Sequence, residues 1–179
     1  MKEKKIYPYM SIGKGLIFFV LLVTIDQLTK KWAVMFLKGQ DPVILIKNVF
    51  QLYYLENRGA AFGILQGRSI VFICITIIIL AVIAFLYVRI PYKRKYRILR
   101  IFMVLIAAGA IGNFIDRVTH HYVVDFFYFN LIDFPVFNVA DIYVTCATIL
   151  LVITIWFRFK DEEAGELLES IRFKKKKQD

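Results

Sequence analysis

Long uncharged apolar runs constrain this chain more than any other feature of its sequence. A helix that crosses the roughly 30 Å hydrocarbon core of a bilayer needs about 20 apolar residues. Ser69 to Val88 is an uncharged run of that length, Ile101 to Ile115 is a shorter run that Ile98 and Leu99 extend, and Ile142 to Phe157 is a third. Hydrophobic residues make up 59% of the 179 residues, which is more than a small soluble domain can bury. The chain is therefore predicted to be an integral-membrane protein.

The first span is less regular than the other three. Residues 12–37 are apolar overall but carry Asp26, Lys30 and Lys31. A basic N-terminus before the apolar run at 16–25 also resembles a cleavable signal peptide. Because no small-residue cleavage pattern follows this run, we interpret residues 12–37 as a retained first helix.

Positive charge is concentrated in three clusters between the apolar runs. Four Lys lie within residues 1–14, six Lys or Arg within 89–100 and seven within 158–179. Such clusters mark the cytoplasmic ends of membrane helices. Both termini and the loop between the second and third helices are therefore expected to be cytoplasmic, and residues 38–68 and 117–136 to face outward. This spacing also argues against a nucleic-acid partner, despite the net charge of +10.

Four residues within or beside the apolar runs have simple interpretations. Arg97 and Arg100 flank the third span and are expected to extend to the membrane interface. Cys74 and Cys146 lie in apolar stretches without CxxC spacing. They indicate neither a disulfide framework nor a zinc site, and they are expected to face lipid or the core.

The first outward segment has the composition of a β-hairpin. Val43 to Ile46 and Val49 to Leu55 are rich in β-branched and aromatic residues, and Lys47 and Asn48 between them are expected to form a turn. The predicted fold is therefore an all-α membrane protein with four transmembrane helices and a small extracytoplasmic β-sheet on the membrane surface.

The chain is expected to be one integral-membrane domain over residues 1–179. Its core covers about 12–157, and 158–179 form a charged, partly helical cytoplasmic tail near anionic lipid. We expect it to act as a monomer in contact with membrane lipid.

Polar residues within the spans, or at their ends, are predicted to converge on the outer membrane face. Ionisable groups in such places are costly and are functional candidates by default. They are Asp26 and Lys30 in the first helix, Asn57 and Arg58 after the β segment, Asn113, Asp116 and Arg117 at the end of the third helix, Asp125 in the following loop, and Asn138 and Asp141 at the start of the fourth helix.

Several of these residues also have purely structural interpretations. Asp26 and Lys30 are four residues apart and would form an ion pair that locks helix packing. Asn138 and Asp141 have the spacing of a helix N-cap and its reciprocal acidic residue. Arg117 would serve as an interfacial anchor.

Other polar and small residues also have structural interpretations. His120 and His121 lack partner ligands at metal spacing and are interpreted as surface residues. Glycines would allow close helix packing. These are Gly59, Gly63, Gly109 and Gly112.

A structural role explains Asp125 least well. The alternative is that Asp125 is an ordinary acid in a loop. It lies inside the apolar run from Val123 to Phe127. Two carboxylates that share a site do not both ionise readily, so one keeps its proton. The ionised one can act as a base on water, and the protonated one can polarise a peptide carbonyl and then protonate the leaving amine. Asp125 is therefore a candidate for such a pair with another acid at the outer face, in chemistry that needs no metal or other cofactor.

Five separated motifs support this prediction. They are Asp26-Gln27-Leu28-Thr29-Lys30, Asn57-Arg58-Gly59-Ala60-Ala61-Phe62-Gly63, Gly109-Ala110-Ile111-Gly112-Asn113-Phe114-Ile115-Asp116-Arg117, Val123-Val124-Asp125-Phe126 and Phe137-Asn138-Val139-Ala140-Asp141. Across residues 12–157 they resemble, in order, the motifs of the bacterial lipoprotein signal peptidase family, also called signal peptidase II. One motif alone is weakly specific, whereas five in order are strongly so.

The resemblance implies an aspartic endopeptidase of the bacterial cytoplasmic membrane, with Asp125 and Asp141 as its catalytic dyad near the extracytoplasmic face. The implied substrate is a prolipoprotein with a diacylglyceryl group on its Cys, cut just before that Cys. No cofactor is implied. The residues that match substrate-binding or supporting positions are Asn57, Asn113, Arg117, Asn138, Asp26, Lys30, Gly59 and Asp116.

The sequence departs from the family's pattern at Ala108, Ile142 and Ala147, and none of these positions belongs to the dyad. Two other classes of protein remain open from the residues alone. A small transporter would also carry intramembrane Asp and Lys, although the cytoplasmic halves of the second and fourth helices are apolar. A chaperone that only binds lipidated substrates would use the same groove.

Overall fold

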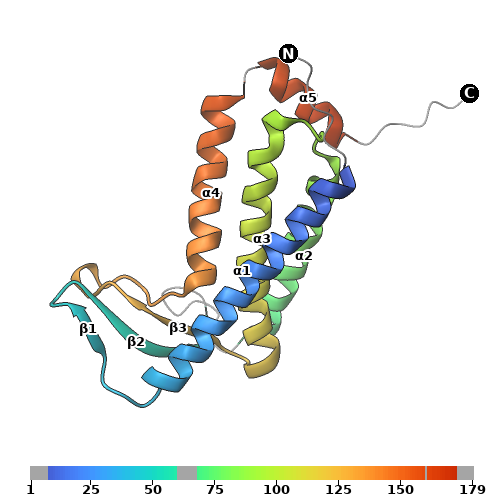
Figure 1. Ribbon diagram of the computed structural model, residues 1–179. Coiled ribbons are helices and arrows are strands. Elements are labelled where there is room, and N and C mark those ends of the chain that lie inside the picture. Colours follow the sequence, from blue (N-terminus) through green and yellow to red (C-terminus); the bar gives the residue numbers. More distant parts are fainter. Residues whose placement is uncertain (1–7, 60–67, 160, 173–179) are drawn as a thin grey trace, which may run out of the picture.

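The computed structural model describes residues 8–59, 68–159 and 161–172. A helical bundle carries a small sheet at one end (Figure 1). The helices are α1 (Pro8–Leu37), α2 (Ser69–Arg89), α3 (Arg97–His120), α4 (Val139–Arg158) and α5 (Asp161–Ile171), with the short 3-10 helices η2 (Arg94–Tyr96) and η3 (Asn130–Ile132). The strands are β1 (Val43–Ile46), β2 (Phe50–Asn57) and β3 (Val123–Tyr128).

Four of the helices are long and apolar enough to cross a membrane, namely Ile12–Leu37, Ser69–Arg89, Arg94–His120 and Val139–Arg158. None of residues 69–89, all of them described, is buried in the protein. Large apolar side chains are exposed along the other spans as well, including Ile17, Trp156 and Phe157. An apolar helix of this kind requires lipid around it. The predicted four-span membrane fold is confirmed.

Helix α3 is the centre of the bundle, because α1, α2 and α4 all pack against it. Two glycines permit this approach. A Cβ at Gly109 would overlap the Ala140 carbonyl of α4, and a Cβ at Gly112 would overlap the Asp26 carboxylate of α1. The predicted packing role is confirmed for these two glycines, whereas Gly63 lies outside the described residues.

The sheet is antiparallel in the order β1-β2-β3. The predicted hairpin is confirmed, and Asn48 in its turn has a φ of 61°, a left-handed conformation that Asn tolerates. Strand β3 was not predicted, and the assignment of Asp125 to a loop is wrong. Asp125 instead lies in β3 opposite Leu55 of β2. The strand forms because both of its faces are covered, and Val124 and Phe126 pack with Ala33 of α1.

The other end of the bundle holds the first turns of α1, the α2–α3 connection and α5 (Figure 1). Helix α5 confirms that the tail is partly helical, and Glu166 joins it to Lys93 at 2.5 Å and to Lys95 at 2.9 Å.

Arg97 at this end is exposed, but the prediction that Arg100 extends to the interface is wrong. The Arg100 side chain is buried and donates hydrogen bonds to the carbonyls of Ile90 and Pro91. The carbonyls at the end of a helix have no hydrogen-bond partner within the helix. Arg100 supplies the donor for two such carbonyls where α2 ends.

Candidate active site

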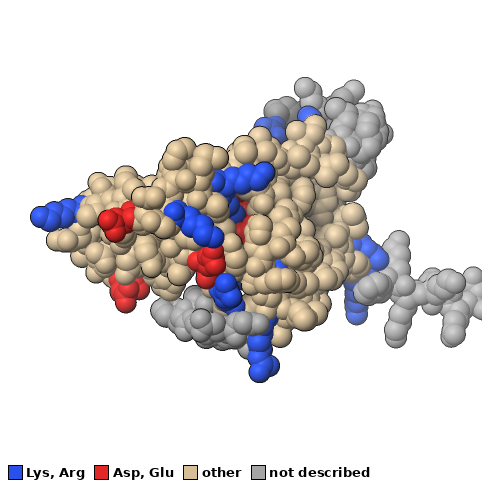
Figure 2. Space-filling model, turned by 90° about the horizontal axis from the view of Figure 1, so that it is seen from below, with Lys and Arg blue, Asp and Glu red and all other residues tan. Residues whose placement is uncertain are grey.

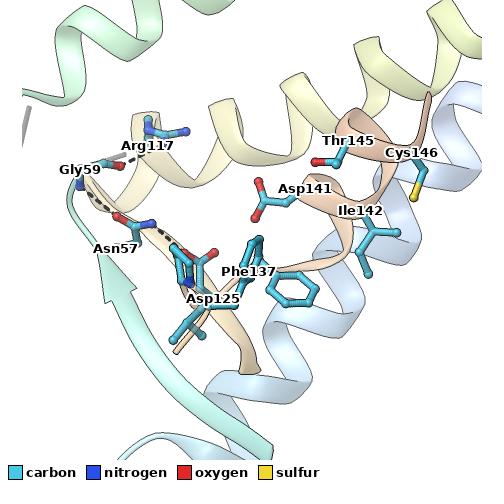
Figure 3. A pocket seen from close by; sticks show the side chains of 12 residues that line it. Asn57, Gly59, Arg117, Asp125, Phe137, Asp141, Ile142, Thr145 and Cys146 are labelled. Atoms are coloured by element: carbon cyan, nitrogen blue, oxygen red, sulfur yellow. Dashed lines mark hydrogen bonds between the residues drawn. The ribbon is translucent and has the colours of Figure 1, made fainter. Parts of the chain in front are cut away.

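Asp125 and Asp141 come from different elements and face the same pocket (Figure 3). Asp125 is held by β3, and Asp141 is the third residue of α4. Asn138 connects them. Its Nδ2 donates to Asp125 Oδ1 at 2.6 Å, its backbone N–H donates to Asp141 Oδ2 at 3.0 Å, and its Oδ1 accepts from the Asp141 N–H at 3.1 Å. Asn138 thus links the two carboxylates, one through its side chain and the other through its backbone.

The interpretation of Asn138 and Asp141 as a helix cap is confirmed, since both halves of a capping box are present. The cap uses only Oδ2 of Asp141. Its Oδ1 accepts a hydrogen bond from Asn113 Nδ2 of α3 at 2.7 Å, and Asn113 Oδ1 accepts from Asn138 Nδ2 at 3.1 Å. Asp141 therefore caps α4 and also lines the pocket, so the two interpretations are compatible.

Asn57, at the end of β2, holds the other oxygen of Asp125. Its Nδ2 donates to Asp125 Oδ2 at 2.8 Å, and its Oδ1 accepts from the Gly59 N–H at 3.0 Å. The Gly59 carbonyl in turn accepts a hydrogen bond from Arg117 Nη2 at 3.4 Å. The guanidinium of Arg117 also lies over the ring of Phe72, 4.7 Å from its centre. These contacts place the guanidinium of Arg117, the side-chain amide of Asn57 and the backbone of Gly59 along one wall of the pocket (Figure 3).

Asp26, Lys30 and Asp116 form a buried layer behind the pocket. Lys30 Nζ lies 3.1 Å from Asp26 Oδ2 and 3.0 Å from Asp116 Oδ2, and it donates to Asn113 Oδ1 at 2.8 Å. The ion pair predicted within α1 is confirmed, and it extends to α3. Because Asn113 contacts Asp141, this layer holds a pocket residue in place without itself lining the pocket.

Hydrogen bonds from the same layer reach the backbone of β3 and α4. Asp26 Oδ1 accepts from the Ala140 N–H at 3.0 Å, and Asp116 Oδ2 accepts from the Val124 N–H at 3.1 Å. Gln27, which the sequence did not single out, donates to Asp116 Oδ1 at 3.1 Å. The residues beside Asp125 and Asp141 are thus both tied to α1 and α3.

The pocket has a volume of about 490 Å³. Its lining residues are Asn57, Gly59, Arg117, Asp125, Phe134, Pro135, Val136, Phe137, Asp141, Ile142, Thr145 and Cys146. Reasoning from the sequence missed the segment from Phe134 to Phe137 and the pair Thr145 and Cys146. The four-residue spacing that puts Thr145 on the same face of α4 as Asp141, and Cys146 on the same face as Ile142, was the available signal for this pair.

The setting of Asp125 is both apolar and close to another acid. The side chain is 1% exposed. Burial, and next the charge of Asp141, raise the pKa of Asp125 to about 7, against the hydrogen bonds from Asn57 and Asn138, which lower it. A carboxyl with such a pKa can hold a proton near neutral pH and release it.

The pocket opens at the end of the bundle that carries the sheet. The space-filling view of this end shows positive and negative side chains at several places on a surface made mainly by other residues (Figure 2). Within the described part of the chain, no group of three or more His, Cys, Asp or Glu side chains could hold a metal ion.

The fold is shared with bacterial membrane enzymes of known structure. The fold is similar to a solved bacterial membrane enzyme, determined by the in meso method at 2.3 Å resolution, with a TM-score of 0.72 and 32% identity over 90% of this chain and 98% of that one. A second bacterial membrane enzyme structure, determined by the same method at 1.9 Å resolution, matches with a TM-score of 0.69 and 32% identity over 89% of this chain and 99% of that one.

Sequence relatives define the family. The family described as Signal peptidase (SPase) II matches residues 18–157. A protein named lipoprotein signal peptidase from Clostridium tetani is 44% identical over 78% of this chain and 90% of its own length. One of the same name from Streptococcus pyogenes serotype M6 is 38% identical over 82% and 93%. The chain belongs to the signal peptidase II family.

Proposed function

We propose that this chain is a lipoprotein signal peptidase that cleaves diacylglyceryl-modified prolipoproteins just before the lipidated Cys. The observation that carries the proposal is the pair of carboxylates, Asp125 and Asp141, that face one pocket and are bridged by Asn138. Membership of the signal peptidase II family supports the substrate class.

The two carboxylates have different environments, which supports an assignment of roles. Asp141 lies in the first turn of α4, where the positive end of the helix dipole stabilises an anion. Asp125 has a pKa of about 7 because it is buried and faces Asp141. Asp141 is therefore the base, and Asp125 is the acid.

Cleavage then proceeds by proton transfer through these two groups. A water held between them attacks the scissile carbonyl carbon and gives one proton to Asp141, while Asp125 gives its proton to the carbonyl oxygen. The resulting gem-diol collapses as the C–N bond breaks. The proton on Asp141 passes to the leaving nitrogen, and a gem-diol hydroxyl returns a proton to Asp125. Both carboxyl groups end in their starting states.

The groups around the dyad have separate tasks. Asn57, Asn138 and Asn113 orient the carboxylates through the hydrogen bonds described above. Arg117 and the Gly59 backbone lie on the wall where the substrate's peptide carbonyls would bind. The buried layer of Asp26, Lys30 and Asp116 fixes Asn113 and the strand from behind.

The apolar side of the pocket suits a lipidated peptide. Phe134, Phe137 and Ile142 line it, and Phe134 and Ile142 are also exposed outside the bundle. The diacylglyceryl chains would extend along these side chains into lipid. The Lys and Arg residues of the α2–α3 connection, at the opposite end, support a cytoplasmic position for that end and an extracytoplasmic site. Because every residue of the site comes from one chain, a monomer is sufficient.

The test uses the purified protein in detergent with two forms of one prolipoprotein, with and without the diacylglyceryl group. We expect cleavage of the lipidated form only, with the lipidated Cys as the new N-terminus by mass spectrometry. Binding of the lipidated form without cleavage would instead favour a chaperone. Ion flux in proteoliposomes without cleavage would favour a transporter.

A further inference from the structure

A group of three cations lies at the end of the bundle opposite the dyad. Lys14 of α1 and Arg97 and Arg100 of α3 line a small pocket of about 200 Å³. Within the described residues, none of the three takes part in an ion pair. By contrast, Lys93 and Lys95, which lie between α2 and α3, are paired with acids of α5. The pocket thus brings together three cations that have no ion-pair partner among the described residues.

Arg100 gives a second indication that the pocket takes an anion. Its side chain is 3% exposed, and its Nη1 donates to the carbonyls of Ile90 and Pro91. Its buried Nε–H has no hydrogen-bond partner among the described residues. A buried donor attached to a cation is costly to leave unsatisfied. An oxyanion in the pocket would supply the missing acceptor.

The pocket continues into an apolar groove of about 460 Å³ between α1, α2 and α3. Gly15, Tyr87 and Val104 line both spaces, so the groove and the pocket are contiguous. Along α2 the groove extends from Val88 to Leu80, which is roughly 12 Å at a rise of 1.5 Å per residue. At the junction of pocket and groove, Gly15 lies close to Tyr87. A Cβ at Gly15 would overlap the Tyr87 hydroxyl, so the absence of a side chain leaves room for both.

We propose that this pocket and groove bind one anionic phospholipid. Its phosphate accepts hydrogen bonds from Lys14, Arg97 and the Arg100 Nε–H, and one acyl chain lies in the groove. The occupant must be anionic at one end and apolar along the rest, and it must be available within a bilayer. An anionic phospholipid meets all three conditions. The site is separate from Asp125 and Asp141, and it does not depend on the peptidase chemistry.

The test measures lipid retention by native mass spectrometry of the full chain. The probes are phosphatidylglycerol and phosphatidylcholine with identical acyl chains. We expect one retained lipid with a preference for phosphatidylglycerol. The double substitution Lys14→Gln and Arg97→Gln removes two exposed cations, and the preference should fall by about fivefold or more. The control, Arg94→Gln with Arg158→Gln, removes the same charge at the same end outside the pocket and should keep the preference.

A second pair of variants tests the groove. Ala84 lines it and Ala81, on the same helix, does not. Ala84→Phe should reduce retention of phosphatidylglycerol, whereas Ala81→Phe should not. The proposal is overturned if the charge control loses the preference for phosphatidylglycerol as strongly as the pocket variant, or if Ala84→Phe and Ala81→Phe retain the lipid equally. It is also overturned if inorganic phosphate alone displaces the lipid, or if a second copy of the chain occupies the groove in a dimer.

Discussion

Replacing Lys30 by Met would test how the buried layer supports the dyad. Lys30 is 3% exposed and is the only cation within 4.0 Å of Asp26 or Asp116 among the described residues. Met has a similar volume but no charge, so two buried carboxylates would lose their counter-ion. Breaking a buried ion pair on one side costs about 3–5 kcal/mol. For a chain of this length that corresponds to a fall in Tm of roughly 10 °C.

The matched control is Lys38→Met. Lys38 also pairs with a carboxylate, Glu56 Oε1 at 2.9 Å, but both side chains are in contact with solvent. Surface pairs contribute little, so its Tm should stay close to that of the wild type. Thermal unfolding of both variants in the same detergent makes the comparison. The double variant Lys30→Met with Asp116→Asn should recover part of the loss. Equal Tm values for Lys30→Met and Lys38→Met would refute the role assigned to the buried layer.

Three further predictions follow from the same contacts. The pKa of Asp125 is about 7, so kcat/KM should fall about tenfold per pH unit above that value in a pH profile. The folded state also holds this proton more tightly than the unfolded chain, in which the pKa is 3.8. The contribution of Asp125 to stability should therefore fall as the pH rises from 4 to 7. Asn138→Ser keeps a capping oxygen but loses the donor to Asp125 and Asn113, so cleavage should slow about tenfold, whereas Asn138→Ala should lose about 1 kcal/mol more of stability than Asn138→Ser because it also loses the cap. Gly112→Ala forces a Cβ against the Asp26 carboxylate and should cost about 1–3 kcal/mol in thermal unfolding, whereas Gly13→Ala, with open space around it, should cost nothing.

Much of the fold could be predicted from the sequence because the membrane leaves few alternatives. The uncharged run from Ser69 has no other stable environment, and the helix it forms ends within one residue of the predicted boundary. The hairpin was predictable because Lys47 and Asn48 separate two runs of β-branched and aromatic residues. Strand β3 was missed because Asp125 interrupts its run and Asp is unfavourable in strands.

The site could be predicted as a set of residues but not as an arrangement. Asp125 stands out in the sequence because it is set among apolar neighbours, whereas Asp141 has the spacing of a helix cap and its proposed role rests largely on the family resemblance. That Asn138 bridges them, and that Lys30 reaches Asp116 on α3, depend on helix crossings that no local pattern encodes. Arg100 was misjudged for the same reason, since the carbonyls it satisfies come from the end of another helix.

The most direct test of the dyad measures cleavage of a diacylglyceryl-modified prolipoprotein by Asp125→Asn and Asp141→Asn, beside the control Asp133→Asn. Asp133 is an exposed acid at the same end of the molecule that does not line the pocket. Both dyad variants should fold, by thermal unfolding, and lose at least about a thousandfold in kcat, while Asp133→Asn stays active. If only the Asp141→Asn variant loses activity, and does so because it misfolds, Asp141 keeps only its role as a helix cap. Full cleavage by a folded Asp125→Asn or Asp141→Asn protein would contradict the two-carboxylate mechanism.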